Sequence, residues 1–310
     1  MILEILSLLL GLAMVVGGAN VLIDGSSSLA RRFGVSDFVI GLVIIGFGTS
    51  LPELVVSVTG ALSRNSAIAI GNVVGSNIFN TLLILGLSAL FAPVAISRKN
   101  KMRDIPIAIL ATFLVVFLGE FGGLSRVEGW VLLAIFAAYL IYTFRTDEPD
   151  SAEASEIKEF PLWASSLLIA GGLACLIFGG NLFVDSAVTL AKLLGVSDKF
   201  IAITVLAFGT SMPELVTTVV ALSKHRSQMA LGNILGSNIF NLLLILGVSA
   251  AICPMSFAGI DAIDITALLL SIILVWTGIY TGKKNLLDRF DASVMLLVFV
   301  GYMVKLFIAL

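Results

Sequence analysis

The sequence predicts an all-α integral membrane protein with ten transmembrane helices, arranged as two inverted repeats of five helices. This prediction rests on the composition, on the length of the apolar runs and on an internal repeat. Of the 310 residues, 59% are hydrophobic and 12% are charged. Soluble domains carry about 25% charged residues, so a water-soluble fold could not hide this much apolar surface.

Ten apolar runs follow one another along the chain, and a run of about 20 residues is long enough to cross a bilayer as a helix. The first run lacks the basic start and the cleavage site of a signal peptide, so we expect it to be retained. The fourth run is short, and the fifth begins among glycines and charges. The predicted spans are residues 2–23, 38–62, 67–91, 105–119, 127–144, 161–184, 199–222, 228–252, 262–281 and 290–309.

The two halves of the chain repeat with a constant offset of 161 residues. The similarity is strongest between residues 46–86 and 207–247, where 24 of 41 positions are identical. The repeat predicts a first five-helix repeat over 1–145, an acidic cytoplasmic linker over 146–160 and a second repeat over 161–310. Because each repeat holds an odd number of spans, the second is expected to enter the bilayer from the opposite side, as in many secondary transporters.

Basic residues in the loops predict the orientation. Thirteen of them lie in the loops after the odd-numbered spans, and four lie in the loops on the other face. By the positive-inside rule the first set is cytoplasmic, so both chain ends are predicted to be extracytoplasmic. We therefore expect a multi-pass protein of the plasma membrane, in contact with membrane lipid and without a nucleic-acid partner.

Each repeat carries a glutamate inside a long apolar run, Glu53 in the first and Glu214 in the second. An ionised carboxylate at mid-membrane costs about 2.5–3.5 kcal/mol, and a bound cation would offset that cost for both groups. The alternative is a pair of structural acids, each bonded to an arginine or a lysine. No basic residue lies in the interior of these central spans, so the pair is interpreted as a cation site.

Pro52 and Pro213 stand directly before these glutamates, and each removes a helical hydrogen bond to a glycine carbonyl group, that of Gly48 or Gly209. We expect the helix to break there in both repeats and to expose backbone carbonyl groups. Irregular backbone at membrane depth is tolerated only where it is buried in protein or lines a polar cavity. A simple kink would explain one copy, but it explains poorly why the string Gly-Thr-Ser-x-Pro-Glu occurs twice.

The spans that follow carry a second repeated string, Gly-Ser-Asn-Ile-Phe-Asn. Its serine and its last asparagine are four residues apart and share one helix face, so we interpret Ser76, Asn80, Ser237 and Asn241 as lining the site. Four further asparagines fit helix packing as well as they fit the site: Asn72, Asn77, Asn233 and Asn238. The two strings offer only oxygen ligands, which suit Ca²⁺ or Na⁺ and disfavour zinc or copper.

With these two motifs, the chain resembles prokaryotic sodium/calcium exchangers of the cation/calcium exchanger superfamily, whose alpha-repeats bear Gly-Thr-Ser-x-Pro-Glu and Gly-Ser-Asn-Ile. The resemblance covers essentially the whole chain. It implies ten helices in two inverted halves and a secondary active antiporter that exchanges Ca²⁺ for Na⁺ by alternating access. It also implies that the protein is not an enzyme and that it needs no cofactor beyond the transported ions.

Carried over by motif position, the resemblance implies that Ca²⁺ is held by Glu53, Glu214 and the carbonyl groups of Thr49 and Thr210. Some members carry an aspartate at the position of Asn241, so this chain has one titratable group fewer, and its coupling ion stays open. The residues implied to form Na⁺ sites or to line the centre are Ser50, Ser76, Ser211, Ser237, Gly46, Ala207, Asn80 and Asn241.

Three other functions would use some of the same features. A Ca²⁺/H⁺ antiporter would load protons onto the two glutamates. A passive cation channel could present the same ligands, and it would pass Ca²⁺ without a counter-ion gradient. An intramembrane enzyme fits poorly, because the single histidine, His225, lies outside the spans and no pair of aspartates lies mid-span.

Overall fold

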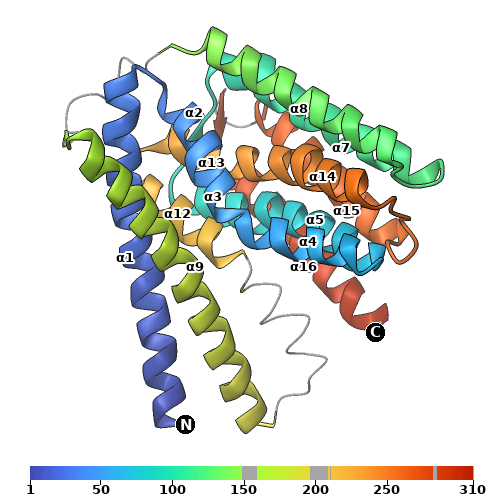
Figure 1. The fold of residues 1–310 in the computed structure, drawn as a ribbon, viewed down its shortest axis with the longest axis horizontal. Helices are drawn as coiled ribbons and strands as arrows, with labels where there is room; N and C mark the ends of the chain where they lie inside the picture. Colours follow the sequence, from blue (N-terminus) through green and yellow to red (C-terminus); the bar gives the residue numbers. More distant parts are fainter. Residues whose placement is uncertain (149–158, 196–208, 210, 282–284, 310) are drawn as a thin grey trace. The chain divides into compact units, whose positions relative to one another are not determined.

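The computed structural model describes residues 1–148, 159–195, 209, 211–281 and 285–309. Over these residues the protein is almost entirely helical (Figure 1). Within the same ranges the strands form one antiparallel pair of two residues each, β1 (Val94–Ala95) and β2 (Leu286–Leu287).

Seven of the described helices are long and apolar enough to cross a membrane, and the prediction of a helical membrane protein is confirmed. In several of them an α-helix continues through a π-helical segment, labelled η. The seven are α1 (Ile2–Phe33), α5–η2–α6 (Ser66–Ile78, Phe79–Leu85, Gly86–Phe91), η3–α7 (Asn100–Asp104, Ile105–Glu120), α8 (Arg126–Thr146), α9 (Leu162–Leu193), α13–η6–α14 (Ser227–Ile239, Phe240–Ile245, Leu246–Ile252) and α16 (Arg289–Ala309).

An interrupted helix forms an eighth candidate span. Two shorter apolar helices, α12 (Met212–Ser223) and α15 (Ala262–Gly278), fall within the predicted spans 199–222 and 262–281. The start of span 199–222 lies outside the described residues. The interrupted helix consists of α2 (Asp37–Ile40), η1 (Gly41–Gly46) and α3 (Phe47–Thr49), followed by α4 (Leu51–Leu62).

Helices α1 and α9 continue past their predicted ends at residues 23 and 184. The serines of the α1 continuation, Ser26, Ser27 and Ser28, are buried, and Ser165 Oγ of α9 lies 3.0 Å from Ser28 Oγ. Helix α1 ends at Gly34, whose positive φ of 63° terminates the helix. Hydropathy therefore located the apolar part of each helix but not its end, which capping and packing determine.

The described helices form two compact units, and each unit contains parts of both sequence repeats. Unit 1 comprises Met1–Thr49 and Glu148–Asn233. Unit 2 comprises Ser50–Asp147 and Ile234–Leu310. These units divide the chain differently from the predicted halves, and one of their boundaries falls at the interrupted helix.

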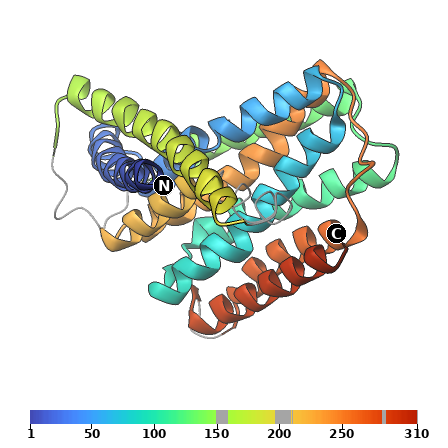
Figure 2. The same cartoon turned by 90° about the horizontal axis from the view of Figure 1, so that it is seen from below.

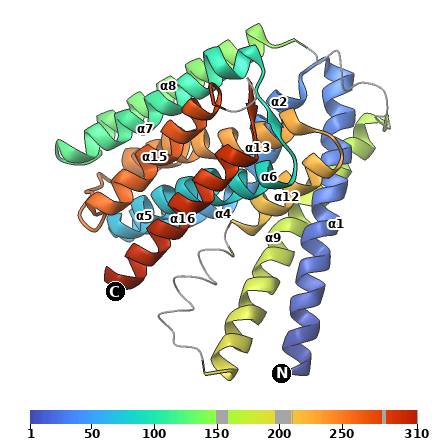
Figure 3. The same cartoon turned by 180° about the vertical axis from the view of Figure 1, so that it is seen from behind.

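In unit 1 the first helices of the two repeats, α1 and α9, lie side by side and antiparallel (Figures 1 and 3). A Cβ added to Gly11 would lie 2.8 Å from the carbonyl oxygen of Gly179, and one added to Gly18 would lie 2.8 Å from that of Gly172. Gly11 and Gly18 are the repeat equivalents of Gly172 and Gly179. The two contacts are therefore equivalent, because the repeat that relates α1 to α9 converts one contact into the other. Only glycine permits the two backbones to approach this closely.

A second close contact in unit 1 joins α2 to α13. A Cβ on Gly232 would collide with the carbonyl oxygen of Phe38. Beside this contact Arg226 Nη1 lies 3.2 Å from Asp37 Oδ2, and both side chains are largely buried. The ion pair and the glycine together fix the start of α2 against α13.

Unit 2 contains the packed helix pairs α4–α5, α8–α14 and α15–α16 (Figure 2). A Cβ on Gly129 of α8 would lie 2.7 Å from the carbonyl oxygen of Gly247 in α14. At the start of the η3–α7 span the buried Asp104 carboxylate accepts hydrogen bonds from Arg103 Nε and Tyr139 Oη, each at 2.8 Å. This network ties that end of the span to α8.

Replacing Gly18 with leucine should lower the free energy of unfolding by about 1–3 kcal/mol, because a larger side chain cannot enter a contact between two backbones. Thermal unfolding of the purified protein in detergent measures this effect. The matched control is Gly17→Leu, because a Cβ at the neighbouring Gly17 meets no atom within 4 Å among the described residues. Equal melting temperatures for the two variants would contradict the proposed role of the contact.

Candidate functional site

Both repeats begin a new helix directly before the glutamate. In the first repeat the helix ends at Thr49, and α4 begins after Ser50, which has φ −85° and ψ 6°. Ser211, with φ −91° and ψ 5°, stands at the same place before α12. Pro52 and Pro213 occupy the first turns of the new helices, where a missing N–H breaks no helical hydrogen bond. The predicted break is confirmed in the first repeat, and the described part of the second shows the same restart.

The two glutamates are buried, with 2% of Glu53 and 1% of Glu214 exposed. Each lies in the first turn of its helix, where free backbone N–H groups favour a negative charge. Glu53 Oε2 has no hydrogen-bond partner among the described residues. Among the described residues, Glu53 also forms no ion pair with a lysine or an arginine. The alternative, in which Glu53 is a structural acid bonded to an arginine or a lysine, therefore finds no such basic residue among the described residues.

The predicted lining residues of the second string, Ser76, Asn80, Ser237 and Asn241, are between 0% and 6% exposed. Asn80 Oδ1 and both amide atoms of Asn241 find no hydrogen-bond partner in the described ranges. A buried polar atom without a partner costs about 1–3 kcal/mol, so such atoms favour a bound ligand. Helix α4 packs against η6, so within unit 2 the helix of Glu53 lies beside the segment that contains Asn241.

Asn80 and Asn241 lie in π-helical segments, η2 and η6, that the sequence did not predict. The two segments begin at equivalent positions of the repeats, Phe79 and Phe240. A third segment, η1, ends at the predicted site residue Gly46. Such segments are rare and occur frequently at functional sites. Apolar periodicity could not have revealed them, because it does not distinguish a π-helical turn from an α-helical one.

The first asparagine of the string, whose role the sequence left open, contacts the turn that bears the glutamate. Asn72 Nδ2 lies 3.1 Å from the Glu53 carbonyl oxygen. Asn233 Nδ2 lies 3.3 Å from the carbonyl oxygen of Glu214. The two asparagines occupy equivalent positions of the repeats, and sequence reasoning did not single them out as acting on the glutamates.

The other two asparagines of the string make different contacts. Asn77 Nδ2 donates to the Val73 carbonyl oxygen of its own helix at 2.7 Å. Asn238 Nδ2 donates to Thr81 Oγ1 at 2.7 Å, within unit 2. These hydrogen bonds involve no glutamate, and the Oδ1 atoms of both asparagines have no hydrogen-bond partner among the described residues.

The predicted site residues are distributed over both units, and each unit contains one glutamate. Ala207 and Thr210 lie outside the described residues. Unit 1 contains Gly46, Thr49, Ser211 and Glu214. Unit 2 contains Ser50, Glu53, Ser76, Asn80, Ser237 and Asn241.

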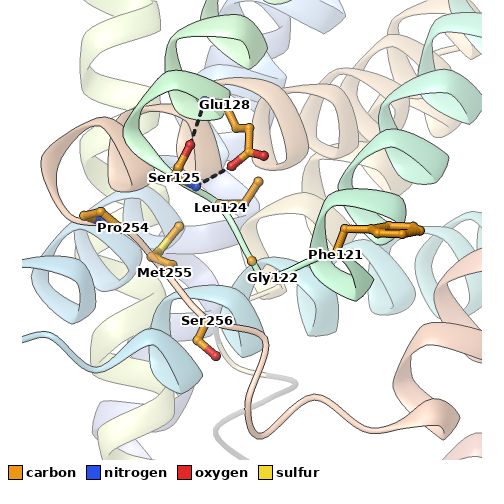
Figure 4. Close-up of a pocket in the computed structure, with 9 residues that line it drawn as sticks. Phe121, Gly122, Leu124, Ser125, Glu128, Pro254, Met255 and Ser256 are labelled. Carbon is orange, nitrogen blue, oxygen red and sulfur yellow. Dashed lines mark hydrogen bonds between the residues drawn. The ribbon is translucent and has the colours of Figure 1, made fainter.

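A surface pocket of about 400 Å³ lies elsewhere in unit 2 (Figure 4). Loops 121–125 and 254–256 line it, and a β-bridge between Leu124 and Met255 holds them together. The Glu128 carboxylate accepts a hydrogen bond from the Ser125 backbone, so it serves as a cap of α8. The pocket contains none of the predicted site residues, so we do not regard it as the candidate site.

The sequence matches the family model for the sodium/calcium exchanger protein over residues 3–145 and 164–308. The sodium/calcium exchanger MaX1 of Methanosarcina acetivorans is 31% identical over 97% of this chain and 98% of its own length. The inner membrane protein YrbG of Escherichia coli is 34% identical over 82% of this chain and 81% of its own length.

Solved structures of the sodium-calcium exchanger NCX_Mj are similar to this fold. One of them, soaked with zero Na⁺ and Ca²⁺, matches 98% of this chain and 99% of its own with a TM-score of 0.85 and 32% identity. Another, soaked with 2.5 mM Na⁺ and 0.1 mM Ca²⁺, matches with a TM-score of 0.82 and 31% identity. The resemblance seen in the two motifs is thus confirmed over nearly the whole chain, and the chain belongs to the sodium/calcium exchanger family.

Proposed function

We propose that this chain is a secondary active antiporter that exchanges Ca²⁺ for Na⁺ across the membrane by alternating access. The observation that carries the proposal is that each repeat has a buried glutamate in the first turn of a newly started helix. The oxygen groups around this position suit hard cations. MaX1 and NCX_Mj, both named as sodium/calcium exchangers, support the choice of ions.

In the proposed site, Glu53 and Glu214 bind the same Ca²⁺, whose two positive charges balance the two carboxylates. The carbonyl groups of Thr49 and Thr210 complete its coordination. Na⁺ competes for the same carboxylate oxygens, and this competition couples the two fluxes. The residues proposed for Na⁺ or for lining the centre are Ser50, Ser76, Ser211, Ser237, Gly46, Ala207, Asn80 and Asn241.

We further propose ten spans in two inverted repeats, over residues 1–145 and 161–310, joined by the cytoplasmic linker 146–160. The two segments matched by the family model support this division. The antiparallel packing of α1 and α9, which are equivalent helices of the two repeats, supports the inversion. The loop charges support an orientation with both ends extracytoplasmic, and we propose that the membrane is the plasma membrane.

A Ca²⁺/H⁺ antiporter is the alternative that uses the same two glutamates. Burial of Glu53 is compatible with it, because a buried carboxylate that has no basic partner among the described residues gains from binding either a cation or a proton. The neutral Asn80 and Asn241 favour Na⁺ coupling, because they offer oxygen ligands but no further proton site. A passive channel is less favoured, since the relatives MaX1 and NCX_Mj are named exchangers.

Purified protein in proteoliposomes loaded with Na⁺ should take up ⁴⁵Ca²⁺ when the Na⁺ gradient points outward. Uptake driven only by an outward H⁺ gradient would support the alternative coupling. Ca²⁺ entry that needs neither gradient would indicate a channel. No uptake with an outward Na⁺ gradient would contradict the proposed exchange.

Glu53→Gln and Glu214→Gln should each reduce exchange to the background level, because the site would keep one negative charge against a divalent ion. The same ⁴⁵Ca²⁺ assay measures the loss, and gel filtration in detergent checks that the variants fold. The matched control is Glu128→Gln, which alters the helix cap beside the surface pocket and should keep normal exchange. Normal transport by either site variant would remove that glutamate from the mechanism.

Single cysteines at the two chain ends test the orientation, in a background with Cys175 and Cys253 replaced. A membrane-impermeant maleimide should label cysteines at positions 2 and 309 in intact cells. A cysteine at position 146 should react only after the membrane is opened. The reverse pattern would overturn the proposed orientation.

A further inference from the structure

We propose that Asn72 and Asn233 are positioning residues, each of which holds the turn that carries the neighbouring glutamate in the orientation needed to bind a cation. This inference rests on the proposed function of Glu53 and Glu214. It assigns a role to a pair of side chains that contribute no ligand to the proposed site. The asparagine and its glutamate are 19 residues apart in both repeats.

In unit 2, Asn72 joins α5 to the first two turns of α4. Its Nδ2 lies 3.1 Å from the Glu53 carbonyl oxygen and 2.9 Å from Ser57 Oγ. Residues 53 and 57 are four apart, so both contacts lie on one face of α4. Two contacts on one face fix the rotation of the helix about its axis. That rotation sets the direction in which the Glu53 side chain leaves the backbone.

In unit 1, Asn233 repeats these contacts and adds two more. Its Nδ2 lies 3.3 Å from the Glu214 carbonyl oxygen and 2.9 Å from Thr218 Oγ1, the equivalent of Ser57. It also lies 2.9 Å from Thr217 Oγ1. Thr49 Oγ1 lies 3.4 Å from Asn233 Oδ1, so one amide contacts both the end of α3 and the glutamate turn of α12.

Asn233 therefore makes more contacts with its glutamate helix than Asn72 makes with its own, and the sequence accounts for the difference. The equivalent of Thr217 in the first repeat is Val56, which offers no hydroxyl group to Asn72. Asn233 is 1% exposed, whereas Asn72 is only partly buried. We infer that Glu214 is held more rigidly than Glu53, so the loss of Asn233 should weaken ion binding more than the loss of Asn72.

The test compares Asn233→Ala and Asn72→Ala with Asn77→Ala as the matched control. Asn77 lies on the same helix as Asn72, but among the described residues its amide hydrogen-bonds only to its own helix. Asn233→Ala should raise the Ca²⁺ concentration for half-maximal uptake by about tenfold, and Asn72→Ala by about threefold, with smaller changes in the maximal rate. Asn77→Ala should leave the half-maximal concentration unchanged. Ca²⁺-induced stabilisation against thermal unfolding gives a second readout that does not need transport.

Thr218 variants keep the test decisive if Asn233→Ala does not fold. Thr218→Val removes the hydroxyl group that Asn233 contacts and should raise the half-maximal Ca²⁺ concentration by about threefold, whereas Thr218→Ser should restore the normal value. Unchanged Ca²⁺ affinity in the asparagine and Thr218→Val variants would overturn the inference, provided that Glu214→Gln abolishes Ca²⁺ stabilisation. If Glu214→Gln binds Ca²⁺ normally, the proposed function itself fails.

Discussion

The structure depends on the burial of a carboxylate in an apolar protein. Glu53 and Glu214 are almost completely enclosed, and an isolated buried charge is among the most costly groups a protein can contain. The helix restart before each glutamate reduces that cost, because the first turn of a helix presents free N–H groups to a negative charge. The proline directly before the glutamate makes this restart possible in both repeats. The remaining cost is what a transported cation can offset.

Close contacts between the backbones of neighbouring helices are the second constraint on the structure. Glycines let α1 approach α9 in unit 1 and let α8 approach α14 in unit 2, at distances that no other residue allows. Helices packed this closely exclude lipid and leave little room for adjustment. The buried polar groups between such helices must therefore find partners in the protein or in a ligand. Asn80 and Asn241 have amide atoms without a partner in the described ranges, and they occur in the segments that bear the predicted lining residues.

Much of this arrangement could be predicted from residue types and spacing. Pro52 and Pro213 marked the helix restarts, and the second string supplied four side chains that the structure buries. The π-helical segments could not be predicted, because the spacing of apolar residues does not distinguish a π-helical turn from an α-helical one. The role of Asn72 and Asn233 could not be predicted from the sequence either. The spacing of apolar residues does not indicate a hydrogen bond from an amide to a carbonyl group 19 residues away.

The sequence by itself determined the helical membrane character of the chain, its internal repeat and the positions of the two glutamates. Each follows from local chemistry, since hydropathy, proline and charge act on the chain wherever they occur. Only the tertiary structure decided how far α1 and α9 extend, and that the compact units combine segments of both repeats. It also decided which asparagine donates to which glutamate turn. These properties depend on contacts between helices distant in sequence, and close packing selects such contacts among many that the same residue types would allow.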